Sequence, residues 1–255
     1  MKLIIKIVFV VVFVAGCNGA TLGSLTKQLT NLETELIDAR NADDAAAEVA
    51  AAGELRTLAS KAESNAGKAK TTPDVIAFYR IAATAAWQGE STNVVALGTS
   101  GFDKCKELGL ATAPTRDCFM LRIIPDLAAT DKLTARLDQA TEDIKAERAK
   151  PVADRSPEVI AQIGVEGDAI FDGFQNRFDG FKAAKADFVD IALPDGLDEL
   201  NEKNKNFIFC RMRDALAVQM LSVGNTAPEF AENQAELETI RQDHDPNDQI
   251  NCAAS

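Results

Sequence analysis

Histidine, tryptophan and tyrosine are almost missing from this chain, because each occurs once in 255 residues. A metal centre built on histidine has few ligands to draw on, and no Cys-x-x-Cys pair takes their place. The sequence also lacks a Gly-x-Ser-x-Gly nucleophile motif and a glycine-rich phosphate loop. We therefore expect neither enzymatic activity nor a cofactor.

Basic charge is scarce as well. The chain has 27 lysines and arginines against 39 acidic residues, a formal net charge of −12. Nucleic acid is excluded as a partner, since its phosphates would be repelled. A hydrophobic fraction of 46% and a charged fraction of 26% are typical of a globular protein.

The longest uncharged apolar run stands at the N-terminus. Residues 1–16 carry Lys2 and Lys6, and an uncharged stretch of isoleucine, valine, phenylalanine and alanine extends from Ile7 to Ala15. A basic segment followed by a short apolar one is the pattern of a secretory signal. The apolar run is too short to span a bilayer, which takes about 20 apolar residues. We interpret residues 1–16 as a signal peptide.

The residues that end this run add a second signal. Val14-Ala15-Gly16-Cys17 resembles the lipobox of bacterial lipoproteins. The resemblance implies that Cys17 is lipidated with palmitate-type chains and becomes the first residue of the mature protein. From the length of the chain we expect residues 17–255 to form a single domain. In that family Asp after the cysteine favours the inner membrane. Asn18 stands there instead, so the resemblance favours an outer-membrane anchor with the body facing the periplasm or the cell surface.

Export would place the other cysteines in an oxidising compartment. Four cysteines follow Cys17, and we expect two disulfides. Three pairings are open. Pairing between sequence neighbours is favoured, which gives Cys105–Cys118 and Cys210–Cys252, with the acidic tail folded back on a helix near Phe207.

Helical periodicity runs through the body. Leucines 22, 25, 29, 32 and 36 are spaced by three and four residues, which predicts a helix with one apolar seam that packs inside the monomer or, less favoured, in a coiled coil. Pro73 is placed to open a later helix, and Pro125 should kink or divide another. No convincing alternating strand appears. The expected fold is all-α, an irregular bundle or a short stack of helical hairpins with about seven helices.

Two further features concern the organisation of the domain. The stretch from Phe78 to Gly89 resembles the first helix and turn glycine of one tetratricopeptide-type hairpin, and no second copy is visible. Residues 150–157 form a polar connector and a candidate sub-boundary, and Ser156-Pro157-Glu158 predicts the start of the next helix.

A row of phenylalanines lies on that next helix. Its spacing of three, four, three and seven residues puts every member on one stripe, and glycines 164, 167, 173 and 180 interrupt the same helix. The stripe fits a helical core, with glycines admitting a neighbouring helix, or an apolar pocket for a lipid-like ligand. The row consists of Phe171, Phe174, Phe178, Phe181 and Phe188.

The acidic tail offers one weak metal motif. Asp243, Asp245 and Asn247 have the spacing that begins an EF-hand-type calcium loop, but Asp248 and Ala254 occupy its glycine and glutamate positions. We therefore predict no metal site, and interpret this stretch as a solvated turn held by Cys252.

Taken together, the patterns predict a lipid-anchored envelope protein that serves as a non-enzymatic helical scaffold or protein-binding module. Its partners would be the membrane, through the lipid, and an envelope protein that the sequence does not identify. The alternative is a carrier of a small apolar ligand beside the phenylalanine row; an envelope enzyme is the least favoured reading.

Overall fold

A computed structural model of the chain describes residues 21–110, 112–188, 206–217, 228–245, 250 and 252. All regular structure in those ranges is helical, and the two expected disulfides are present. The expectation of an all-α fold with about seven helices is thereby confirmed. Among the described residues, we find no helix with the length and hydropathy of a membrane span.

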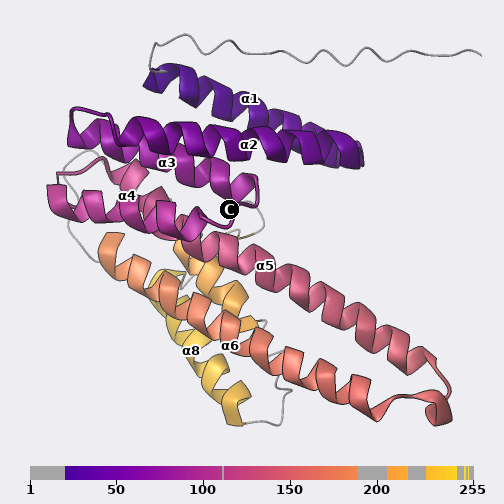
Figure 1. Cartoon of the computed structure of the whole chain (residues 1–255). Helices are drawn as coiled ribbons and strands as arrows, with labels where there is room; N and C mark the ends of the chain where they lie inside the picture. Colours follow the sequence, from indigo (N-terminus) through magenta and orange to yellow (C-terminus); the bar gives the residue numbers. More distant parts are fainter. Residues whose placement is uncertain are drawn as a thin grey trace, which may run out of the picture.

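The first four helices build one layer of antiparallel neighbours (Figure 1). Each packs against the next along the chain, and α3 also contacts α1 and α5. Short turns join them, which is typical of antiparallel packing. These helices are α1 (Leu22–Asn41), α2 (Ala45–Ala66), α3 (Thr72–Gln88) and α4 (Val94–Leu108).

The leucine seam of α1 packs inside the monomer, as the favoured interpretation held. Leu25 and Leu36 are 0% and 1% exposed, and both belong to the core shared with α2 and α3. The Thr21 hydroxyl accepts the backbone N–H of Ser24 and caps the helix. The apolar period therefore predicted a buried face correctly.

The starts and ends of α3 and α4 follow local chemistry, except that the start of α4 has no side-chain cap. Thr71 caps α3 and Pro73 lies in its first turn, while Gly89 follows its last residue. Gly109, with φ of 87°, ends α4 in a conformation that favours glycine. Asn93 stands at the start of α4 without a side-chain cap, and the Ser91 hydroxyl donates to its amide oxygen.

Two long helices leave this layer as a pair. α5 (Thr115–Ala149) leads through the short 3-10 helix η1 (Val152–Asp154) to α6 (Pro157–Phe188). Ser156 accepts the backbone N–H of Val159, as its sequence context predicted. Pro125 does not divide α5, which is continuous through it.

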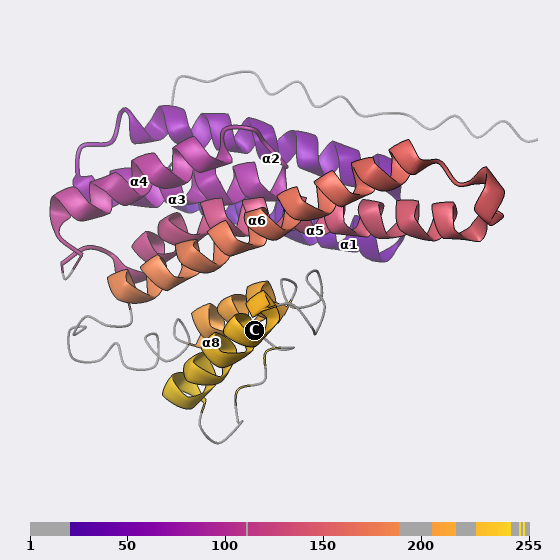
Figure 2. The same cartoon turned by 90° about the horizontal axis from the view of Figure 1, so that it is seen from below.

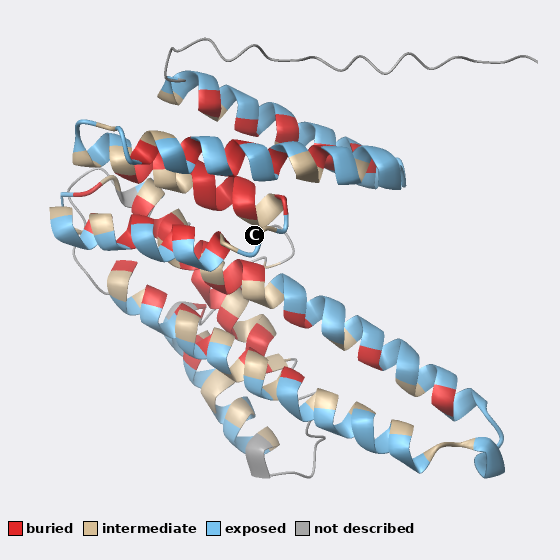
Figure 3. Cartoon of the chain, in the orientation of Figure 1, coloured by how far each residue is buried: buried red, intermediate tan, exposed pale blue. Residues whose placement is uncertain are grey.

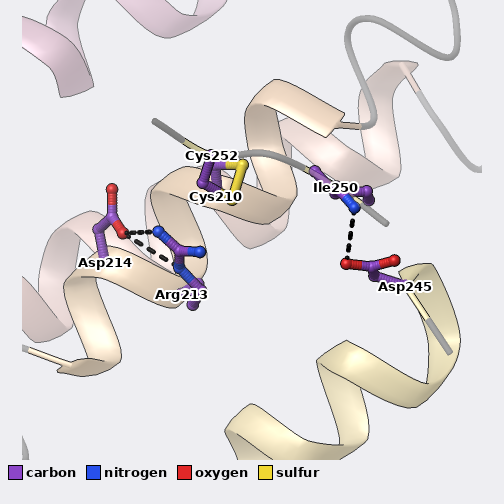
Figure 4. The surroundings of a disulfide bond; sticks show 6 residues. All are labelled: Cys210, Arg213, Asp214, Asp245, Ile250 and Cys252. Carbon is purple, nitrogen blue, oxygen red and sulfur yellow. Dashed lines mark hydrogen bonds and ion pairs between the residues drawn. A yellow bond between two sulfur atoms is a disulfide. The ribbon is translucent and has the colours of Figure 1, made fainter. Parts of the chain in front are cut away.

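The last described segments pack beneath the pair (Figure 2). Residues 206–217 are helical, and α8 (Pro228–His244) lies beside them. The Cys210–Cys252 bond joins the chain end to the 206–217 helix (Figure 4). The tail therefore folds back as expected.

Candidate docking arm and neighbouring surfaces

The far halves of α5 and α6 project beyond the other helices (Figures 1 and 2). We call residues 136–170 the arm. Arg136 of α5 donates to both carboxylate oxygens of Glu166 on α6, at 2.6 and 2.9 Å. Ala140 and Ile170 are buried in the arm, so a narrow apolar seam and this ion pair hold its two helices together.

The tip of the arm is ordered by one carboxylate. Glu147, 4% exposed, accepts the backbone N–H of Ser156 at 2.6 Å and the Lys150 ammonium at 2.5 Å. These hydrogen bonds lower the pKa of the Glu147 carboxyl. The Arg155 guanidinium closes the turn by donating to the backbone oxygens of Arg148 and Lys150.

One side of α6 in the arm is apolar and open to solvent. Ile160 and Val165 are 52% and 70% exposed, while most of the arm is pale blue in Figure 3. Ala161 and Gly164 are also exposed. Of the six large hydrophobic residues exposed in the described chain, these two and Val152 (78%) lie in the arm.

The four glycines of α6 divide into two pairs. A Cβ added at Gly173 would overlap the Leu133 side chain of α5, and one at Gly180 would come within 2.6 Å of Asp126. Their role in close helix packing was anticipated. At Gly164 and Gly167 an added Cβ meets nothing within 4 Å, so no contact in the monomer explains them.

The phenylalanine row lies mostly in the core. Phe181 and Phe188 are each 1% exposed, Phe174 and Phe178 are 3% and 4%, and Phe171 is half-buried. Phe188 packs edge-on against Phe119 of α5, with ring centroids 5.5 Å apart. No member of the row lines the hollow beside Asp126, the hollow beside Trp87 or the hollow between the arm helices.

A charged cluster joins α5 to α6 where the arm leaves the body. Asp126 is 7% exposed and receives hydrogen bonds from Arg122 at 3.0 Å and Arg177 at 2.7 Å. Arg122 also donates to the backbone oxygen of Gly180 and to Asp187. This network satisfies the buried carboxylate and borders a hollow of about 430 Å³. Sequence reasoning missed it, although Arg122 and Asp126 have the four-residue spacing of a helical ion pair.

Two other hollows are lined by polar and apolar residues together. One of about 560 Å³ lies where Arg40, Trp87 and Lys132 approach one another, and the Trp87 indole N–H donates to Asp131 at 2.7 Å. The other, of about 530 Å³, lies between the arm helices beside Glu147 and Ile163. Both are lined by acids and bases together.

Two of the three tail residues with calcium-loop spacing, Asp243 and Asp245, lie in the described part of the chain. Asp245 is 4% exposed and accepts the backbone N–H of Ile250 at 3.0 Å (Figure 4), so the expectation of a solvated turn is wrong at this residue. Asp243 is exposed, and Asn247 lies outside the described residues. In the described part of the chain, no three histidine, cysteine or acidic side chains are grouped as a metal would require.

The lipidation candidate, Cys17, lies outside the described residues. Comparison of the chain with protein families, with characterised proteins and with solved structures finds no match. The tetratricopeptide-type resemblance of α3 thus gains no support from a relative.

Proposed function

We propose that this chain is a lipid-anchored protein of the bacterial envelope and that it binds other proteins through the exposed face of its arm. The observation that carries the binding role is the apolar side of α6, because the protein exposes Ile160 and Val165 on a segment built to project. Clustered exposed apolar side chains are characteristic of interaction surfaces.

The anchor in this proposal is Cys17, lipidated after residues 1–16 are removed. Two or three acyl chains bind a bilayer far more firmly than one, at about 0.8 kcal/mol for each buried CH₂. The mature body has 25 basic and 39 acidic residues, a charge of −14, so an anionic bilayer would repel it. The lipid therefore supplies the attachment, and Asn18 favours the outer membrane.

The position of the arm suits such a protein. The start of α1, close to the proposed anchor in the sequence, and the tip of the arm lie at opposite ends of the molecule in both views (Figures 1 and 2). An anchored body would thus hold the arm away from its point of attachment. Because the phenylalanine row is packed against α5, a protein-binding role is favoured over a carrier of apolar ligands.

Lipidation is tested by Cys17→Ser. The hydroxyl does not replace the thiol as the acceptor of the diacylglyceryl group, so the variant should take up no radiolabelled palmitate and should accumulate as the unprocessed precursor. Asn18→Ser serves as the control and should be labelled normally. Undiminished labelling of Cys17→Ser would contradict the anchor.

Protein binding is tested separately with a photocrosslinking amino acid at position 160, in the bacterial envelope. A matched variant carries it at Val49, which is 69% exposed on α2. Position 160 should give a discrete protein adduct and position 49 should not. Co-purified lipid without a protein adduct would favour the carrier instead.

A further inference from the structure

We propose that the arm binds a second copy of this chain, with the two α6 helices antiparallel and crossing at Gly164. This proposal names the partner in the binding function proposed above. It rests on the arm being a binding surface, and it does not depend on lipidation. Three features of α6 carry it: its apolar side, its open glycine and its distribution of charge.

The apolar side is continuous and faces away from α5. At 100° per residue, Pro157, Ile160, Ala161, Gly164 and Val165 fall within about 140° of the helix circumference. All five are exposed, whereas Ile163 and Glu166 on the other side line the contact with α5. This side spans more than two turns and has no partner within the described part of the monomer.

Gly164 sits near the middle of this side, with exposed Ala161 one turn before it. Glycine in a helix interior is less stable than alanine, and no atom of the monomer within 4 Å requires a glycine at this position. A second helix crossing here could approach closely, as small residues allow. Flanking Ile160 and Val165 would then be covered by the partner.

Charge selects a second copy in the antiparallel orientation. Residues 145–155 at the tip hold four bases and two acids, a net charge of +2, whereas residues 157–180 of α6 hold five acids and one base, a net charge of −4. An antiparallel crossing at Gly164 places residue 156 opposite residue 172 of the other copy. Each basic tip then lies beside the acidic stretch of its partner, near Arg148 and Asp172. A parallel arrangement would put like charges together.

Two opposing effects set the strength of the association. Each mature body carries a charge of −14, but at physiological salt the Debye length is about 8 Å, so distant charges are screened while the close tip contacts persist. The contact, about 24 Å of helix, is small for a stable dimer. We therefore expect a weak, concentration-dependent dimer in solution.

The decisive experiment uses Gly164→Cys in residues 18–255, where the four native cysteines are paired. Two copies crossing at Gly164 bring the new thiols together, and the substitution meets no atom within 4 Å in the monomer. Mild oxidation should convert most of the protein to a linked dimer. The matched control Val49→Cys should remain at least about tenfold less crosslinked. Equal crosslinking of the two variants, or none of Gly164→Cys, overturns the proposal.

Charge reversal tests the orientation. Asp172→Lys should weaken dimerisation about tenfold in sedimentation equilibrium, since it faces the basic tip. Adding Arg148→Glu to the same chain should restore the dimer, because both symmetric contacts are then reversed together. Failure of the double variant to recover overturns the antiparallel arrangement.

The photocrosslink at position 160 separates this inference from the proposed function. An adduct of twice the chain mass supports self-association. An adduct with a different protein overturns the second copy as the partner, while the binding role of the arm stands.

Discussion

Glycine residues in α6 illustrate how one residue type meets different demands along a helix. Gly180 lies against Asp126, whose carboxylate pairs with two arginines, so the position has no room for a side chain. Gly167 faces open space, so no contact in the monomer requires a glycine at that position. Only their surroundings in the fold distinguish the two.

The effect of alanine should therefore differ in sign between these positions. Gly180→Ala should lower the free energy of unfolding by about 2 kcal/mol, because its Cβ displaces a buried, paired carboxylate. Gly167→Ala should raise the free energy of unfolding by up to about 1 kcal/mol through helix propensity. Urea unfolding followed by circular dichroism measures both, and equal effects at the two sites would contradict this account.

Glu33 of α1 shows how burial alters a single titration. Removal from water raises the pKa of its carboxyl, and the nearby Arg80 guanidinium only partly opposes the shift. The folded protein thus holds this proton to a higher pH than the unfolded chain does. Ionising Glu33 costs stability, which falls as the pH rises from the unfolded pKa, about 4.3, through the folded pKa.

Glu33→Gln should remove that loss. The variant should be more stable than the wild type at neutral pH, with the difference shrinking below about pH 4, where the wild-type carboxyl is protonated in both states. Melting temperatures recorded across this range test the claim. Glu35, exposed two residues along α1, provides the control as Glu35→Gln. A constant difference between Glu33→Gln and the wild type at every pH would show that ionisation is not the cause.

Among the elements, α5 tolerates a proline because α4 makes room for it. Pro125 removes a backbone donor from the helix, yet α5 continues unbroken to Ala149. The Pro125 ring lies so near Gly98 of α4 that a Cβ there would approach its Cγ within 2.6 Å. Packing against α4 and the buried residues around Leu121 therefore outweigh the local penalty.

The C-terminal elements are held by buried side chains of the 206–217 helix, by a crosslink and by an ion pair. The Cys210–Cys252 bond closes a separation of 42 residues and holds the chain end to the 206–217 helix, while Lys182 of α6 pairs with Glu236 of α8. On the loop-entropy model this disulfide contributes about 4 kcal/mol. It should act locally, because it joins the chain end only to the 206–217 helix, whereas α1 to α4 pack against one another.

Replacing both partners, with Cys210→Ser and Cys252→Ser, should loosen this end before the body melts. Hydrogen exchange should accelerate in residues 206–217 and in α8, while α1 to α3 keep their protection. Removing the Cys105–Cys118 bond alone, with Cys105→Ser and Cys118→Ser, should instead accelerate hydrogen exchange in α4 and at the start of α5. That bond joins these two helices. Uniform loss of protection throughout the chain would show that the 210–252 bond supports the global fold.

At the scale of the whole molecule, a compact layer of helices is extended by a less buried pair (Figure 3). The buried residues concentrate in α1 to α4 and in the near halves of α5 and α6, and they become sparse along the arm. An arm of this kind contributes little to the core. The proposed contact outside the monomer would account for its projection, and the crosslinking experiments test that contact.

The sequence by itself determined the helices, because apolar residues at intervals of three and four must share one helix face, and capping residues such as Thr71 and Ser156 stand at their starts. It also indicated both disulfides, since each links sequence neighbours among the four cysteines.

Only the tertiary structure decided which residues meet across helices. Asp126 with Arg177, and Pro125 with Gly98, are far apart along the chain, and periodicity carries no information about such pairs. The same holds for exposure. Phenylalanines 174 to 188 and Ile160 all lie on α6, yet only packing against α5 shows that the former are covered and that Ile160 is left to solvent.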